Sequence, residues 1–158
     1  LYAGRQDLND EKIKLAEVTN KNKTSGTLET VIKAADIFVG VSKAGVLTKE
    51  MIQSMNNEPV VFALANPIPE VMPDIAKEAG AFIVATGRSD FPNQINNVLA
   101  FPGIFRGALD NNVHQITDAM LIAAAEALAN YVQDLSVEKV LPNVFDKGVS
   151  AAVAAVIK

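Results

Sequence analysis

Three short apolar runs recur along the chain at nearly constant spacing. They are DIFVGV, PVVFAL and AFIVAT, at residues 36–41, 59–64 and 81–86. Each run is rich in Val, Ile and Phe and does not alternate polar with apolar residues, which is typical of parallel strands covered on both faces. The centres of the runs lie roughly 22 or 23 residues apart, which is enough chain for a strand, a helix and two short loops.

Three segments beside these runs carry the start or stop signals of helices: residues 27–35, 48–55 and 73–80. Thr27 and Thr48 are candidate N-caps, and Pro73 suits the first position of a helix. Alternation of strands with helices predicts an α/β fold with a doubly wound parallel sheet of the Rossmann type. Short buried helices in place of the strands are the alternative.

After Thr86 the pattern becomes helical. One or two helical turns are expected at 93–99, and Pro102 is expected to open a short helix. Longer helices are predicted at 116–135 and 144–158, the last starting near Asp146 or Lys147. We therefore expect residues 1–158 to form the C-terminal portion of one nucleotide-binding domain. Its parts would be strand–helix units over about 27–86, a ligand loop at 86–103 and helices at 104–158.

Composition excludes several classes of protein and site. Hydrophobic residues make up 49% of the 158 residues, which argues against disorder. The net charge of −4 and the lack of a long basic run argue against nucleic-acid binding. With no cysteine and one histidine, the chain cannot form disulfides, thiolate metal sites or a multi-histidine metal site. No run of apolar residues is long enough to cross a membrane.

In open parallel sheets, ligands bind outside the carboxyl ends of the strands. Polar or small residues follow each predicted strand: Gly40-Val41-Ser42, then Ala65-Asn66, then Gly87-Arg88-Ser89-Asp90 with Asn93, Gln94, Asn96 and Asn97. These three sets are predicted to meet at one edge of the sheet. This edge is the candidate ligand site.

Each candidate also has a structural interpretation. Gly40 would let the backbone approach a flat ligand, or it is a turn glycine. Asn66 would orient a ligand amide or carboxylate, or it forms an Asx-turn before the next proline. Arg88 and Asp90 are interpreted as an ion pair that holds the loop, in preference to direct substrate contacts.

The amide side chains at 93–97 are more numerous than helix capping requires, because capping uses one amide. Neutral amides can donate to a carboxylate and accept from a nicotinamide carboxamide without adding charge. Two signals are missing from the sequence. It contains no G-x-G-x-x-G turn and no evident set of metal-binding carboxylates or catalytic base.

The segments DIFVGVSKAGVLT, FALANPIPE and ATGRSDFPNQINNVLAFPGIFRGAL resemble the cofactor-binding domain of malic enzymes, especially the shorter prokaryotic type. The resemblance covers nearly the whole chain, and its most specific part is the run that contains Arg88 and Asn97. It implies oxidation of (S)-malate by hydride transfer to NAD or NADP, with NAD favoured. Loss of CO2 then gives pyruvate, with help from Mg2+ or Mn2+.

The resemblance also implies roles for single residues. Asn66 and Asn97 would lie against the nicotinamide end of the cofactor and the malate carboxylate. Val41 and Ser42 would line the cofactor together with Gly40. Shaping roles are expected for Arg88, Asp90 and Asn96.

The family's catalytic lysine and tyrosine, its metal ligands and its glycine-rich turn have no counterpart in these 158 residues. We therefore expect a piece of a longer cytoplasmic enzyme, inactive alone, whose intact form is a homodimer or larger. Mg2+ or Mn2+ would bind to the missing N-terminal part. A non-catalytic nucleotide-binding or regulatory module is the main alternative, and a different α/β dehydrogenase is a third.

Overall fold

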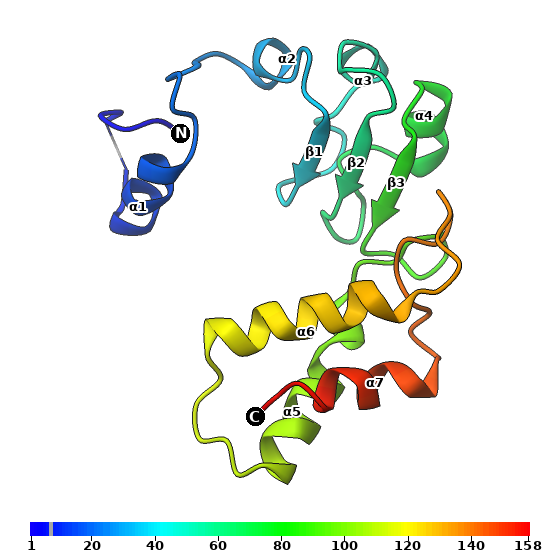
Figure 1. The fold of residues 1–158 in the computed structure, drawn as a ribbon. Helices are drawn as coiled ribbons and strands as arrows, with labels where there is room; N and C mark the ends of the chain where they lie inside the picture. Colours follow the sequence, from blue (N-terminus) through cyan, green and yellow to red (C-terminus); the bar gives the residue numbers. More distant parts are fainter. Residues whose placement is uncertain (7) are drawn as a thin grey trace.

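The computed structural model describes residues 1–6 and 8–158, and it contains a small sheet above a group of helices (Figure 1). The strands are β1 (Ile37–Gly40), β2 (Val60–Ala63) and β3 (Ile83–Thr86). The helices before and between the strands are α1 (Asp10–Val18), α2 (Leu28–Val31), α3 (Lys49–Gln53) and α4 (Pro73–Glu78). The 3-10 helix η1 (Asn97–Leu99) and the helices α5 (Phe101–Asp110), α6 (Asp118–Tyr131) and α7 (Lys147–Ala154) follow β3.

The three strands form a parallel sheet in the order β1-β2-β3. Each strand lies within one of the predicted apolar runs, so the prediction of an α/β fold with a parallel sheet is confirmed. Short buried helices at these positions, the alternative, are ruled out.

Helices cover one face of this sheet. Phe38, Val61 and Val84 point to that face and pack with Ile52 of α3 and Ala76 of α4 in one buried cluster. Parallel crossovers are right-handed, so a strand order that advances in one direction places successive helices on the same side.

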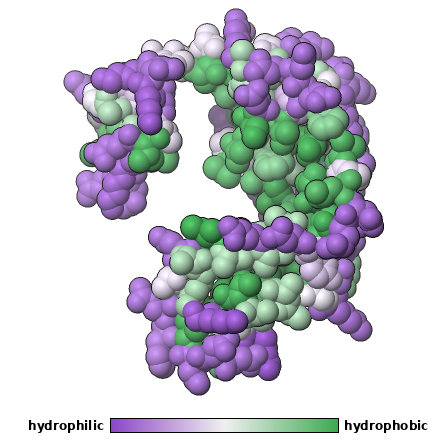
Figure 2. Space-filling view, viewed as in Figure 1, coloured by the Kyte–Doolittle hydropathy of each residue, from purple (hydrophilic) through white to green (hydrophobic). Residues whose placement is uncertain are grey.

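The other face of the sheet is open along β1. The side chains of Ile37 and Val39 are 58% and 57% exposed, and hydrophobic residues gather over the strands in the space-filling view (Figure 2). The expectation that both faces are covered is therefore wrong for β1 within the described residues, whereas Ala85 of β3 is fully buried. The apolar runs indicate how hydrophobic each strand is. They do not indicate which face of the sheet is covered by helices of this chain.

Capping residues set several helix boundaries as predicted. The Thr48 hydroxyl accepts a hydrogen bond from Met51 N at 3.3 Å, and Asp146 accepts one from Gly148 N at 3.0 Å. Helix α2 is shorter than expected, because Ala34 adopts a left-handed conformation with φ of 56°.

Helix α1 is absent from the sequence predictions. Its N-cap is Asn9, whose side chain accepts a hydrogen bond from Lys12 N at 3.0 Å, and Asp10 and Glu11 occupy its first turn. These are recognisable start signals, but only Ala16 of this helix is buried, so the hydrophobic periodicity that would support them is weak.

The C-terminal helices form a second core around Ile104, Ala124 and Val153. Helices α5 and α7 approach closely at two glycines of α5. A Cβ atom on Gly103 would lie 2.5 Å from the Val153 Cβ, and one on Gly107 would lie 2.5 Å from a backbone oxygen of α7. In the described part of the chain, no helix is long and apolar enough to cross a membrane.

Candidate functional site

The carboxyl ends of the three strands lie at one edge of the sheet, on the side facing α6 (Figure 1). Gly40 pairs with Ala63, and Ala63 pairs with Thr86, so the three strands end in register. Neighbouring strands are about 4.8 Å apart, so the loops that follow them begin side by side. The predicted convergence of the three polar sets is confirmed at the level of the backbone.

A carboxylate that the sequence analysis did not single out joins the first two loops. Glu70 is fully buried, and its Oε1 accepts a hydrogen bond from Ser42 N at 2.7 Å. Its Oε2 accepts one from Ala65 N at 3.0 Å. Burial raises the pKa of Glu70, but the hydrogen bonds from the Ser42 and Ala65 amides outweigh it, and the net pKa lies below the usual range. Glu70 is therefore held as a carboxylate.

The position of Glu70 gives Gly40 a structural role. A Cβ atom at Gly40 would lie 2.5 Å from the Glu70 Cδ, closer than non-bonded atoms allow. The side of Gly40 on which a Cβ would lie faces a buried carboxylate, so packing alone requires a glycine here. The expected approach of the Gly40 backbone to a flat ligand stays a prediction. Val41 and Ser42, which begin the next loop, are exposed. The hydroxyl of Ser42 also donates to Glu70 Oε1, at 3.4 Å, so both donors of Ser42 are directed to this carboxylate.

The loop after β3 contains the ion pair that the sequence predicted. Arg88 donates to both carboxylate oxygens of Asp90, at 2.8 Å from Nε and 2.6 Å from Nη2. The hydrogen bond from Arg88 lowers the pKa of the Asp90 carboxyl below its usual range. The guanidinium carbon also lies 5.2 Å from the centre of the Phe91 ring. These contacts tie the first half of the loop together.

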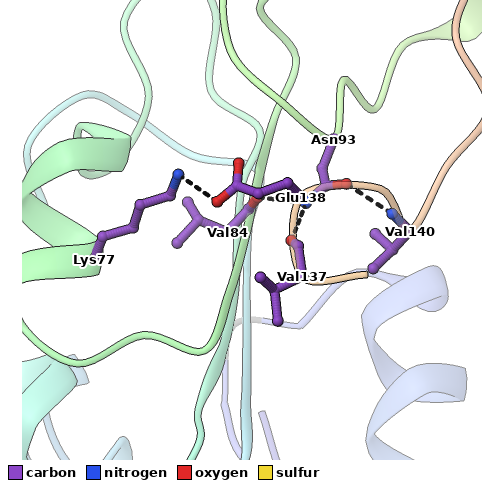
Figure 3. A network of polar contacts seen from close by, with 6 residues as sticks. All are labelled: Lys77, Val84, Asn93, Val137, Glu138 and Val140. Atoms are coloured by element: carbon purple, nitrogen blue, oxygen red, sulfur yellow. Dashed lines mark hydrogen bonds and ion pairs between the residues drawn. The ribbon is translucent and has the colours of Figure 1, made fainter. Parts of the chain in front are cut away.

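Asn93 is a buried link between this loop and a distant segment (Figure 3). Its amide nitrogen donates to the carbonyl oxygens of Val84 at 3.1 Å and Val137 at 2.8 Å. Its side-chain oxygen accepts from Val140 N at 2.8 Å. Asn93 also has φ of 55°, a conformation that asparagine tolerates better than most residues. Its amide is fully engaged inside the protein, so a role in ligand binding is excluded.

The segment around residue 138, which contacts Asn93, also forms an ion pair with α4. Lys77 of α4 forms a 2.7 Å ion pair with Glu138, beside the Asn93 contacts (Figure 3). Both side chains are partly exposed, so the pair contributes little stability by itself. It does link the segment around residue 138 to α4.

Two further amides of the loop are engaged internally. The side chain of Gln94 donates to Gly87 O at 3.4 Å, and that of Asn96 accepts from Val98 N at 3.0 Å as the cap of η1. The expectation that four amides between residues 93 and 97 face a ligand together is therefore wrong. The local sequence could not show that three of them fold the loop itself.

Asn66 and Asn97 are the amides left for a ligand. Both residues are exposed, and within the described residues their side chains have no hydrogen-bond partner. Asn66 follows β2 directly after the Ala65 amide that Glu70 anchors, and Asn97 opens η1 after β3. The Asx-turn suggested for Asn66 does not form. The site thus offers two neutral amides on separate loops of one sheet edge.

The described residues do not supply a metal centre. Among residues 1–6 and 8–158, no group of three or more His, Cys, Asp or Glu side chains could hold a metal ion. The buried Glu70 is already satisfied by backbone amides, and Asp90 is paired with Arg88. Neither carboxylate is therefore free to ligate a metal ion.

Comparison with known proteins agrees with this geometry. The family model described as "Malic enzyme, NAD binding domain" matches residues 1–158. The chain belongs to the malic enzyme family. Its α/β fold with a parallel sheet is the Rossmann-like fold of the NAD-binding domain of malic enzymes.

Three relatives illustrate the similarity. The bifunctional malic/malolactic enzyme of Bacillus subtilis is 57% identical over 157 residues, which are 98% of this chain and 38% of that protein. The NADP-dependent malic enzyme of Halomonas elongata is 47% identical over 148 residues, covering 93% of this chain and 34% of that protein. The crystal structure of an NAD-dependent malic enzyme from Thermotoga maritima has a TM-score of 0.90 and 48% identity, over 96% of this chain and 40% of the other. This malic enzyme domain therefore spans less than half the length of each relative.

Proposed function

We propose that the full-length protein oxidises (S)-malate to pyruvate and CO2 while it reduces NAD or NADP. The observation that supports this proposal is a pair of exposed side-chain amides, Asn66 and Asn97, which have no hydrogen-bond partner within the described residues. They lie on two loops that begin side by side at the carboxyl edge of the sheet in a malic enzyme domain. When bound, the nicotinamide cofactor accepts the hydride from C2 of malate.

In this proposal the residues of this chain bind and orient malate and the nicotinamide. Asn66 and Asn97 can each donate from the amide nitrogen to a malate carboxylate and accept at the amide oxygen from the nicotinamide carboxamide. Because both amides are neutral, they hold the reactants without a fixed charge beside the ring that receives the hydride. Val41 and Ser42 are exposed on the neighbouring loop and line the cofactor in this proposal, with the N–H and hydroxyl of Ser42 directed to Glu70.

Supporting residues keep these groups in place. The Arg88–Asp90 ion pair closes the loop before Asn97, and Asn96 caps the turn that Asn97 begins. Any Mg2+ or Mn2+ would be held by residues other than those described. Names of relatives include both NAD-dependent and NADP-dependent enzymes, and we propose NAD as the preferred cofactor.

The experiment is a turnover assay of the full-length protein with malate, Mn2+ and either NAD or NADP. Equal amounts of pyruvate and reduced cofactor are expected, because each malate loses one hydride and one CO2. Reduced cofactor without pyruvate would indicate a simple dehydrogenase. Cofactor binding without either product would indicate a non-catalytic nucleotide-binding module. Lactate should be measured too, since one relative is named a malic/malolactic enzyme.

A further inference from the structure

Glu70 is a buried carboxylate to which the proposed reaction assigns no role. It lies between β2 and α4 with its side chain fully buried, and both of its oxygens are occupied by backbone N–H groups. One group is Ser42 N, on the loop after β1, and the other is Ala65 N, on the loop after β2. A carboxylate accepts at both oxygens, so it can hold two donors at once.

The same segment anchors the first loop at two more points. Gly45 N donates to Pro69 O at 3.3 Å, and Leu47 N donates to Glu70 O at 3.1 Å. The loop after β1 is thus attached along its length to residues 69–70. Together with the Ser42 contact, these bonds fix the loop relative to the chain that carries Asn66.

The end of β1 is shaped to admit this carboxylate. Gly40 has no side chain, and a Cβ atom there would lie 2.5 Å from Glu70 Cδ and 2.7 Å from Glu70 Oε1. Gly40 and Glu70 therefore form one unit, in which the missing side chain of one makes room for the other.

We propose that Glu70 is a positioning residue that sets the spacing between the Val41–Ser42 turn and Asn66, and so the fit of the nicotinamide end of NAD(P). The inference rests on the proposed function. Glu70 does not touch the reactants and acts through the two backbone amides that it binds. Charge-assisted hydrogen bonds from backbone amides are stronger than neutral ones and hold the loops more firmly.

The first test is Glu70→Gln in the full-length protein. Glutamine keeps the shape of the side chain but presents an NH2 group to one of the two backbone donors, so that contact is lost. We expect the Kd and KM for NAD(P) to rise roughly 10-fold, the scale of a loop misplaced by a fraction of an ångström, with a smaller change in kcat. Hydrogen exchange at the Ser42 and Ala65 amides should accelerate, which reports the anchor independently of turnover.

Ile52→Val is the matched control, because Ile52 of α3 is about as buried as Glu70, but its side chain belongs to the hydrophobic cluster and cannot hydrogen-bond to the anchored amides. It should lower stability without changing the Kd for NAD(P). If Glu70→Gln does not fold, Glu70→Asp provides the same test, because it keeps the charge but shortens the side chain by one methylene.

A double-variant cycle tests the unit directly. Gly40→Ala should weaken NAD(P) binding strongly in the wild type but little in a Glu70→Ala background, where the space for a Cβ is free. If the effects of Gly40→Ala and Glu70→Ala on NAD(P) binding are additive, or if Glu70→Gln binds NAD(P) as tightly as Ile52→Val, the inference is overturned. The proposed function would then still stand. A wild-type protein that binds neither NAD nor NADP would overturn the proposed function, and this inference with it.

Discussion

The side-chain amide of Asn93 donates a hydrogen bond to the carbonyl oxygen of Val137 at 2.8 Å, across 44 residues of sequence. With its bonds to Val84 and Val140, it joins the end of the sheet, the loop after β3 and the segment that follows α6. The loop that presents Asn97 is therefore supported from the C-terminal half of the chain.

Replacing Asn93 with alanine should destabilise the fold. The change leaves two carbonyl oxygens and one N–H without their partner, and a loss of about 2–4 kcal/mol in unfolding free energy is expected. Urea denaturation of the full-length protein measures it. The control is Asn112→Ala, because Asn112 has a similar φ of 50° but is exposed. If both variants lose the same unfolding free energy, the hydrogen bonds of the Asn93 side chain contribute no stability beyond the effect of its backbone conformation.

Stability should depend on pH through Glu70. The pKa of Glu70 is lowered in the folded protein, so its contribution is fully present above the ordinary glutamate pKa of about 4.3 and is lost as pH falls through the lower folded pKa. The difference in unfolding free energy between wild type and Glu70→Gln should be constant near pH 7 and shrink below pH ~4. Denaturation curves over this range provide the measurement. A difference that grows as the solution becomes more acidic would contradict the sign of the shift.

The contact between α5 and α7 should not tolerate a methyl group at Gly107. The new Cβ would lie 2.5 Å from the carbonyl oxygen of Ala154 and 2.8 Å from the Ile157 Cβ, so the helices must separate. Gly107→Ala is expected to cost about 1–3 kcal/mol, although alanine is otherwise the better helix former. Leu109→Ala on the exposed side of α5 is the control, and it should change the melting temperature little. A stabilised Gly107→Ala protein would show that the two helices do not pack this closely.

Asn96 and Asn97 are neighbours in sequence, but their substitution should have opposite consequences. Asn97→Ala is expected to lower kcat/KM for malate roughly 100-fold, because a donor to the reacting groups is lost, while stability is unchanged. Asn96→Ala should cost about 0.5–1 kcal/mol of stability, the usual value of an N-cap, with a smaller loss of rate. The two variants are compared by steady-state kinetics and urea denaturation. Equal kinetic losses would mean that Asn97 has no special role.

The sequence predicted the strands and their common edge because these features depend on local pattern. Apolar runs of strand length and helix signals between them leave few alternatives to a parallel sheet, and a parallel sheet brings the chain after Gly40, Ala63 and Thr86 together. The start of α7 directly after Asp146 is equally local, since the capping side chain and the helix it caps are adjacent.

The interior of the site was less predictable because its contacts are not local. Nothing near Asn93 in the sequence indicates that its partners include Val137 and Val140, so the local pattern predicts a ligand-binding amide there. One feature of the sequence points to Glu70: it is a charged residue in the otherwise apolar stretch IPEVMP. Its partner Ser42 lies 28 residues earlier, however, and only the fold brings the two together.

A structure of the full-length protein with NAD(P) and succinate would show whether Asn66 and Asn97 contact the reactants, because succinate has the carboxylates of malate without the hydroxyl that is oxidised. We expect the side-chain amides of Asn66 and Asn97 to lie within about 3.2 Å of the nicotinamide end of the cofactor or of a succinate carboxylate. Ligands bound elsewhere, with both amides still facing solvent, would contradict it.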